Sequence, residues 1–226
     1  MTDAEPSPFK LLPLPGFLRL VARMETALAL PNGFSRGLLD EDDWSFVVKL
    51  HALLEASITM LLVERLGGPS TLREPEKHVE SLATRTKINL AYSLGLFDAD
   101  ARLFLNKLSE LRNGLVHRVA NVGVSLSDRI AAMTDRQKAE FTGWVVPGPH
   151  SARTKQALEK PRLAMWLRAF FLICMWKLDI DRLRIERGHT EGDVLEPLEN
   201  LRQVGDDLAE IAKLMKAEGL DPEAGV

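Results

Sequence analysis

The sequence is short of several residue types, and each shortage narrows what the protein can be. Its 226 residues include a single cysteine, Cys174, a single tyrosine and only 6% aromatic residues. Because Cys174 is alone and lies in an apolar run, one chain forms neither a disulfide framework nor a cysteine-rich zinc site, and we expect a buried structural thiol. The sequence also lacks a Gly-rich phosphate loop and a G-x-S-x-G elbow. No cofactor is indicated.

The net charge and the hydropathy of the sequence also indicate no particular binding partner. A net charge of −3 gives no global field that would recruit nucleic acid or an anionic membrane. Residues 1–8 are acidic and proline-bearing, and they lack the basic start and apolar stretch of a signal peptide. The most hydrophobic window, 163–180, contains Arg168 and Lys177, which a membrane span rarely tolerates, so we interpret it as a core helix. We therefore expect a cytoplasmic protein with no membrane partner.

The residues that are abundant favour helices. Leu and Ala supply most of the apolar mass, and apolar positions recur at three- and four-residue steps. The acidic run 40–43 suits a helix N-terminus, Gly67 predicts the end of that helix, and Asp98 is a plausible cap for another. Helices are predicted at 16–30, from the run 40–43 to 66, and at 79–94, 99–118, 127–141, 154–187 and 194–218, with at most an extended strip at 119–126 and a loop at 144–149.

These elements predict an all-α fold, a helical bundle with an amphipathic C-terminal helix. We divide the chain into a lead-in with a short helix (1–39), the bundle (40–187), and a C-terminal helix and tail (188–226) that packs on the bundle or on a second chain. Large apolar residues encircle the helix 154–187, which predicts a helix central to the bundle or buried at a dimer contact. These residues are Trp166, Phe170, Phe171, Ile173, Cys174 and Trp176.

The predicted helix 99–118 carries the one segment that suggests a specific chemistry, from Leu111 to His117. At about 100° per residue, Asn113 and His117 fall on a polar stripe opposite the core face, and Arg112 lies on the flank. The core face itself consists of Phe104, Leu108, Leu111 and Leu115, and the flank includes Leu105 and Val116. A polar stripe usually faces water, whereas an Arg, an Asn and a His beside an apolar flank suit a cleft or a dimer seam. The spacing leaves both interpretations open.

The segment Arg112-Asn113-x-x-x-His117 resembles the R-x4-6-H signature of the HEPN superfamily. Three longer stretches resemble the mannitol operon repressor (MtlR) branch of that superfamily, and the likeness covers about residues 40–145. The stretches are His51-Ala-Leu-Leu-Glu-Ala-Ser-Ile-Thr-Met-Leu, Lys87-Ile-Asn-Leu-Ala-Tyr-Ser-Leu-Gly-Leu-Phe and Leu111-Arg-Asn-Gly-Leu-Val-His. The stretch Val122-Gly-Val-Ser-Leu-Ser-Asp-Arg-Ile is similar to the segment C-terminal to the His in that branch.

The resemblance implies a helical homodimer in which Arg and His of both chains line a shared cleft. In catalytic members of the superfamily that cleft cuts RNA without a metal. By this analogy His117 acts as general acid or base on the ribose 2′-hydroxyl, Arg112 holds the phosphate, and Asn113 orients the ring or the phosphate. Toxin members related by the motif often have a tyrosine two residues after the His. Here that position is Val119, so regulation through such a tyrosine is not expected.

Two functions are consistent with these residues. The first is a helical regulator or binding protein, MtlR-like and homodimeric, that acts through protein or RNA contacts. The second is a metal-independent endoribonuclease, a toxin or defence effector, that uses Arg112, Asn113 and His117. Gly114 is predicted in mid-helix, where glycine costs about 1 kcal/mol relative to Ala, and we interpret it as permitting close approach of a partner helix.

Other polar residues are weaker candidates. Lys87, Lys107 and Arg118 are candidate binding residues that, together with Arg85, Arg112 and Arg129, would form a basic patch if two helices pack side by side. Scattered surface charge is the alternative that we favour, because acidic residues are interleaved. Glu55 is expected to reach Arg112 or Lys87 in a structural salt bridge. The other histidines, His51, His78, His150 and His189, share no metal-ligand spacing, so we predict no metal site.

Overall fold

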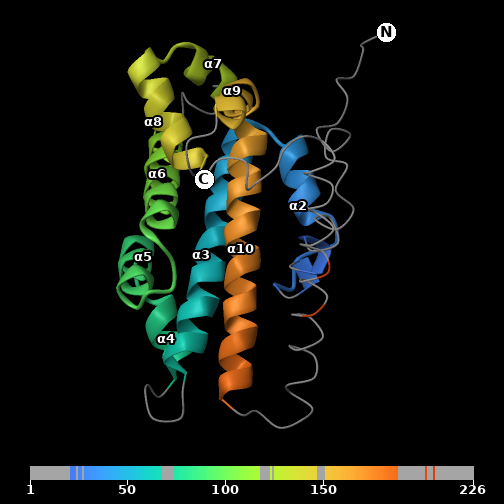
Figure 1. Cartoon of the computed structure of the whole chain (residues 1–226), viewed down its shortest axis with the longest axis vertical. Helices are drawn as coiled ribbons and strands as arrows, with labels where there is room; N and C mark the ends of the chain where they lie inside the picture. The colour runs from blue at the N-terminus through green and yellow to red at the C-terminus, as the bar shows by residue number, and fades with distance from the viewer. Residues whose placement is uncertain are drawn as a thin grey trace. The chain divides into compact units, whose positions relative to one another are not determined.

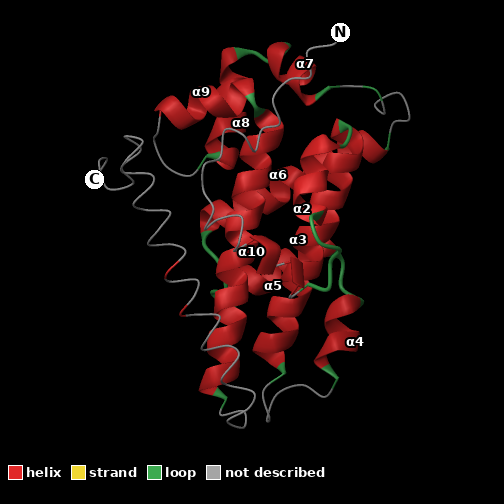
Figure 2. Ribbon diagram, turned by 90° about the vertical axis from the view of Figure 1, so that its right-hand side faces the viewer, coloured by secondary structure: helices red, strands yellow, loops and turns green. Residues whose placement is uncertain are grey.

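The computed structural model describes residues 21–67 except 24 and 27, residues 74–117, 123, 125–146 and 151–187, and the single positions 202 and 206. Within these ranges the regular structure is helical and contains no strand (Figure 2), which confirms the all-α prediction. The predicted helix 194–218 lies outside the described residues apart from positions 202 and 206, and most of the strip 119–126 lies outside them as well.

The chain divides into two compact units, one of residues 1–35 and 181–226 and one of residues 36–180. In the first unit the Glu25 carboxylate, which is buried, accepts hydrogen bonds from the backbone N–H groups of Gly33 (2.8 Å) and Ser35 (2.6 Å). Gly33 has a φ of +79°, a conformation that glycine adopts without strain. This contact closes the turn predicted after the segment 16–30. Helix α2 (Phe34–Gly37) spans the boundary between the units.

The second unit begins with the short 3-10 helix η2 (Leu38–Asp40) and the long helix α3 (Asp43–Leu66). Asp42 caps α3, because its side chain accepts a hydrogen bond from the Ser45 N–H at 2.9 Å. Gly67 ends the helix by donating its N–H to the Val63 carbonyl. Both predicted signals, the acidic run and the glycine stop, are therefore confirmed.

The helix predicted at 79–94 is wrong, because the structure has two helices, α4 (Pro75–Glu80) and α5 (Thr84–Ser93). The chain turns between them. The Ser81 hydroxyl donates to the His78 carbonyl at 2.8 Å, and Ala83 has an extended backbone before α5. Side-chain hydrogen bonds of this kind compete with helix continuation.

Helix α6 (Ala99–Val116) has its predicted cap, since the Asp98 carboxylate accepts a hydrogen bond from the Ala101 N–H at 2.7 Å. The helix predicted at 127–141 is wrong, because it is divided into α7 (Leu126–Ala131) and α8 (Asp135–Val145). Thr134 and Gln137 form a reciprocal capping box that starts α8. Helix α8 also extends into the segment 144–149, which was predicted to be a loop.

The helix predicted at 154–187 is divided into α9 (Ser151–Glu159) and α10 (Pro161–Glu186). Proline is tolerated in the first turn of a helix, where its missing N–H has no intrahelical partner. The prediction that 163–180 is the most hydrophobic window is also wrong. Among the described helices, α3 is the one that is long and apolar enough to cross a membrane by length and composition, and half of its apolar window is buried in the protein. A buried core helix meets the same criterion.

In the 36–180 unit, α3 and α10 lie side by side, α6 packs on α3, and α8 packs on α6 (Figure 1). Helices α4 and α5 pack at the end where α3 finishes, and α7 and α9 lie at the opposite end. Aromatic rings fill the space between the helices, with centroids of Phe104 and Trp144 at 5.7 Å and of Trp166 and Phe170 at 4.7 Å. The largest fully buried side chains are Trp166, Phe46, Phe104, Phe170, Leu38, Leu50 and Leu54.

One arginine joins the first turns of several elements, and we call this group the Arg162 hub. Arg162 of α10 donates from Nε to the Asp43 carboxylate at 2.8 Å and from Nη1 to the carbonyls of Leu39 (2.9 Å) and Glu41. The second carboxylate oxygen of Asp43 accepts the Leu126 N–H at 2.6 Å. The hub therefore connects η2, α3, α7 and α10 through charge-assisted hydrogen bonds.

Candidate functional site around Arg112 and His51

The buried and exposed faces of helix α6 are those that the helical wheel predicts. Phe104, Leu105, Leu108 and Leu115 are buried, while Leu111 is half-buried. The opposite side, which we call the exposed α6 face, consists of Glu110, Asn113, Gly114 and His117, all of which are exposed. Hydrophobic patterning alone therefore predicted correctly which side chains of the segment 111–117 face the core and which face outward.

The three predicted catalytic residues lie in different environments. Arg112 is half-buried, and its Nη1 donates to the Asn113 side-chain oxygen at 3.0 Å. His117 is the residue directly after α6, where its backbone N–H donates to the Asn113 carbonyl at 3.1 Å and its side chain is exposed. Asn113 thus accepts a hydrogen bond from Arg112 through its side chain and one from His117 through its backbone carbonyl. In the described part of the chain, the Arg112 and His117 side chains share no hydrogen bond.

Gly114 lies in the last turn of α6 rather than in mid-helix as predicted, since α6 ends at Val116. A Cβ atom built on Gly114 meets no atom of the same chain within 4 Å, so packing within the chain does not require the glycine.

Side chains from three helices form a half-buried group that we call the inner polar cluster. Its contacting members are His51 and Glu55 of α3, Lys87 of α5 and Ser109 of α6, and we include Arg112 of α6 because its charge acts on His51. His51 Nε2 lies 3.1 Å from Ser109 Oγ, and Lys87 Nζ lies 3.2 Å from Glu55 Oε1. The Lys87 side chain is only 6% exposed and that of Glu55 is 32% exposed. The expected salt bridge of Glu55 is therefore confirmed, and its partner is Lys87.

Hydrogen bonding fixes the roles of the His51–Ser109 pair. Ser109 Oγ also lies 2.8 Å from the Leu105 carbonyl, and a carbonyl only accepts, so the hydroxyl proton is directed there. The lone pair of Ser109 Oγ then accepts a proton from His51 Nε2. Neutral His51 therefore carries its proton on Nε2 and a lone pair on Nδ1. Ser109 is not activated as a nucleophile, because the imidazole donates to it instead of removing its proton.

The electrostatics of the cluster keep His51 neutral. Burial lowers the pKa of His51 below its ordinary value of 6.5, and the positive charge of Arg112 lowers it further, while Glu55 acts in the opposite direction. Burial raises the pKa of Glu55, but hydrogen bonds from Thr84 and Lys87 outweigh it, so the net pKa of Glu55 is lowered. At neutral pH the cluster holds a carboxylate, two cations and a neutral imidazole.

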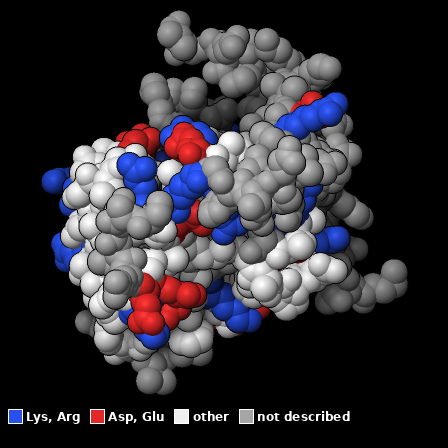
Figure 3. All heavy atoms as spheres, turned by 90° about the horizontal axis from the view of Figure 1, so that it is seen from below, with Lys and Arg blue, Asp and Glu red and all other residues white. Residues whose placement is uncertain are grey.

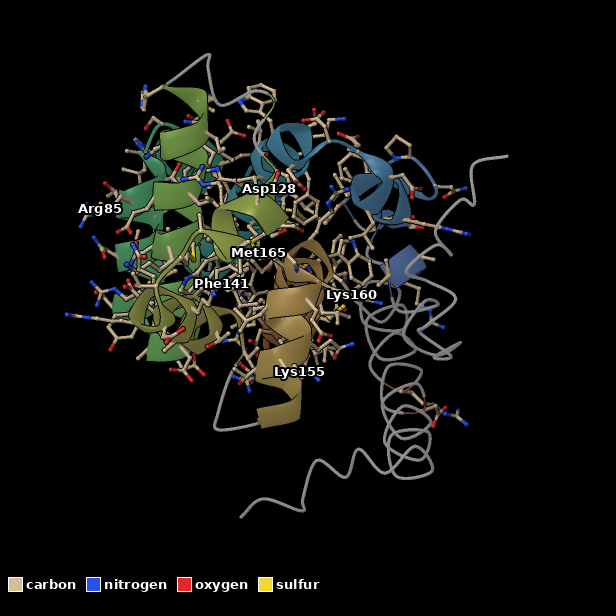
Figure 4. All side chains as sticks on the ribbon, turned by 90° about the horizontal axis from the view of Figure 1, so that it is seen from above. Arg85, Asp128, Phe141, Lys155, Lys160 and Met165 are labelled. Carbon is tan, nitrogen blue, oxygen red and sulfur yellow. The ribbon has the colours of Figure 1, made fainter. Side chains whose placement is uncertain are left out.

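Lys107, the other predicted binding residue that the structure describes, pairs with carboxylates of α6 and α8. Lys107 lies 2.7 Å from Glu140 and 3.3 Å from Glu110, and these carboxylates raise its pKa. Arg118 lies outside the described residues. Arg85 is exposed and points away from the bundle, in contrast to the buried Phe141 and Met165 (Figure 4). Basic and acidic side chains lie interleaved on the face shown in Figure 3, as expected of scattered surface charge.

Sequence reasoning missed His51 and Ser109 as members of the site. The available signal was the spacing of His51 and Glu55, four residues apart and therefore on one side of a helix. The partner Ser109 depends on the register of α6 against α3, which no local pattern encodes. Among the described residues, no group of three or more His, Cys, Asp and Glu side chains is suited to hold a metal ion.

No protein-family model matches this chain, and neither a curated protein nor a solved structure is similar to it.

Proposed function

We propose that the protein is a homodimeric helical binding protein, a regulator of the kind implied by its resemblance to the MtlR branch, and that two copies associate through α10. The observation that carries this proposal is an apolar stripe on α10 that remains at the surface. Phe171 is 49% exposed and Met175 is 40% exposed, although the rest of the helix up to residue 180 is largely buried. We call this surface the α10 stripe, and it consists of Ala164, Leu167, Phe171, Met175 and Leu178.

Exposed aromatic and methionine side chains in a row are characteristic of interaction surfaces, because water is expelled from them on binding. The stripe runs along one side of α10, since its members are three or four residues apart. Phe171 was predicted to be buried in the bundle or at a dimer contact. Because it is exposed within the chain, the dimer contact is the alternative that the proposal retains.

The pattern of the stripe favours a second copy as the occupant. Its apolar members lie at −7, −4, +4 and +7 around Phe171, so the stripe has the same character when read in either direction. A two-fold symmetric contact requires such a self-complementary surface. Antiparallel pairing of two α10 helices brings Phe171 against Phe171 of the second copy and Leu167 against Met175. None of the five positions is charged, so pairing desolvates no ionised group at these positions.

The test compares two exposed apolar residues by sedimentation. Phe171→Glu places a carboxylate next to its own copy across the symmetry axis, and we expect it to weaken self-association by at least about 100-fold, or roughly 3 kcal/mol. The control is Leu103→Glu on α6, because Leu103 is 42% exposed and lies outside the stripe. This control is expected to associate like the wild type. A monomeric wild type, or a Leu103→Glu variant that dissociates as readily as Phe171→Glu, would overturn the proposal.

A ribonuclease is the second candidate, and the observation in its favour is the exposed His117 side chain. Two features favour the binding function over it. The Arg112 guanidinium donates to Asn113 rather than lying free for a phosphate, and the exposed α6 face lies at the C-terminal end of a helix, where the backbone carbonyls disfavour a phosphate. RNA cleavage that survives a chelator and disappears in His117→Ala would establish the enzyme instead. We expect no RNA cleavage by the wild type or by His117→Ala.

A further inference from the structure

Arg168 of α10 is a buried cation that borders the α10 stripe. The residue is only 8% exposed, and its Nε atom is fully buried without a hydrogen-bond partner. In the described part of the chain the carboxylates that act on Arg168 are those of Asp98 and Asp100, and neither accepts a hydrogen bond from it. A buried charge without a partner is costly, because it loses hydration and gains no counter-charge. The surface beside the stripe therefore lacks a carboxylate that Arg168 needs.

We propose that Arg168 pairs with Asp179 of a second copy, and that this ion pair fixes the antiparallel register of the two α10 helices. The inference rests on the proposed function and deepens it, because it names the charged residues that select one arrangement of the apolar stripe. By symmetry the contact contains two such pairs.

The first argument is the position of both residues around α10. At about 100° per residue, Arg168 lies about 60° from Phe171 and Asp179 about 80° from it, on the same side of the stripe. Asp179 is half-buried, as expected at such a border. The two-fold axis of an antiparallel pair places the same flank of both helices on the same side of the contact. Arg168 of one copy and Asp179 of the other therefore border the contact together.

The second argument is their position along the helices. In a pairing centred on Phe171, Arg168 lies level with Cys174 of the second copy, and Asp179 of that copy follows about 7.5 Å further along. Side chains on a helix lean toward its N-terminus. In antiparallel helices these directions are opposite, so Arg168 and Asp179 of the second copy lean toward each other. The length of the arginine side chain closes the remaining distance.

The third argument is selectivity. The apolar stripe reads alike in both directions, so its packing accepts a parallel as well as an antiparallel second copy. A parallel pair has its two-fold axis along the helices, which places Arg168 and Asp179 of the second copy on opposite flanks and about 16 Å apart along the helices. The ion pair forms in the antiparallel arrangement alone, and charge pairs of this kind fix register.

The first test is a double-mutant cycle on self-association of the full chain, measured by sedimentation. We expect Asp179→Asn to weaken association about 10-fold when Arg168 is present, and less than about 2-fold in the Arg168→Met background. Arg168→Met keeps a buried unbranched stem and removes the unpartnered charge, so we expect it to fold. Asp128→Asn on α7, the same change at another exposed carboxylate, is the control and should leave association unchanged.

The second test reads the register with cysteine variants under mild oxidation. In the antiparallel arrangement Leu167 lies against Met175 of the second copy. A mixture of Leu167→Cys and Met175→Cys chains should therefore form mixed covalent dimers, whereas Leu167→Cys alone should form none. Cross-linking of Leu167→Cys alone would indicate parallel pairing.

The outcomes separate this inference from the proposed function. Parallel pairing overturns the ion pair and leaves self-association through α10 standing. An Asp179→Asn effect of equal size with and without Arg168 does the same, because it reflects a contact of Asp179 within its own chain. A monomeric wild type overturns the proposed function and the ion pair together.

Discussion

The Arg162 hub and the inner polar cluster each include an arginine, and they differ in what the arginine contacts. Arg162 binds a carboxylate, Asp43, and two backbone carbonyls, and Asp43 in turn holds the Leu126 N–H. Arg112 donates to the neutral amide of Asn113 and shares its region with another cation and a histidine. The hub balances its charges, whereas the cluster has a surplus of positive charge.

The difference indicates what each group does. A balanced network of charge-assisted hydrogen bonds fixes one arrangement of the helices, because every partner loses its counterpart if the network opens. A group with surplus positive charge is held less firmly, because its cations repel one another. We therefore expect the hub to contribute more to stability than the cluster, and substitutions in each group test this expectation.

The largest expected effect is that of Arg162→Ala. The substitution leaves the Asp43 carboxylate, whose side chain is 11% exposed, without its partner, together with the carbonyls of Leu39 and Glu41. We expect the free energy of unfolding in urea to fall by about 3 to 5 kcal/mol. The exposed pair of Lys77 and Glu74 provides the control, and Lys77→Ala should change stability by less than about 0.5 kcal/mol. A loss below about 1 kcal/mol for Arg162→Ala would remove the contrast between the two groups.

A smaller loss is expected when the cluster loses its lysine. Lys87→Met keeps the buried aliphatic chain but deprives Glu55 of its ammonium partner, and the carboxylate is partly hydrated because Glu55 is 32% exposed. The free energy of unfolding should fall by about 1 to 2 kcal/mol, less than for the hub. Lys107→Met, which breaks the more exposed pair with Glu140, is the reference and should cost under about 1 kcal/mol. If Lys87→Met costs as much as Arg162→Ala, the cluster is as structural as the hub.

The smallest effect concerns pH. Because burial lowers the pKa of His51 in the folded protein below its ordinary 6.5, the folded state takes up its proton less readily than the unfolded chain. The stability associated with this ring is therefore complete above pH 6.5 and declines as the pH falls through the lowered folded-state pKa. Thermal unfolding from pH 7.5 to 5 should show a steeper decline for the wild type than for His51→Gln. Identical profiles would mean that burial of His51 is not linked to folding.

The sequence predicted those helix ends that carry a capping residue or a glycine stop. Asp42 and Asp98 cap α3 and α6, and Gly67 ends α3. The divisions between α4 and α5 and between α7 and α8 were missed, because apolar spacing continues across both turns. The second division does have a sequence signal, the Thr134-x-x-Gln137 capping box, which outweighs that spacing.

The candidate site was predictable only in part, for a different reason. Helical periodicity placed Arg112, Asn113 and His117 around α6, and the position of Glu55 next to a core residue indicated its ion pair. The contact of His51 with Ser109 joins residues 58 positions apart. It arises from the way in which α3 packs on α6, so tertiary structure alone reveals it. The exposure of Phe171 was missed for the same reason, since a ring of apolar residues does not show which side lacks a neighbour.

The central claim, self-association through α10, is tested most directly by a cross-link. Phe171→Cys places a thiol near the proposed two-fold axis, where two copies lie within the short distance that a disulfide requires. The natural Cys174 does not compete, because it is buried and burial raises its pKa to about 12. Under mild oxidation we predict a covalent dimer for Phe171→Cys and monomer for Leu103→Cys. Monomer for Phe171→Cys, or equal cross-linking of both variants, would contradict the account.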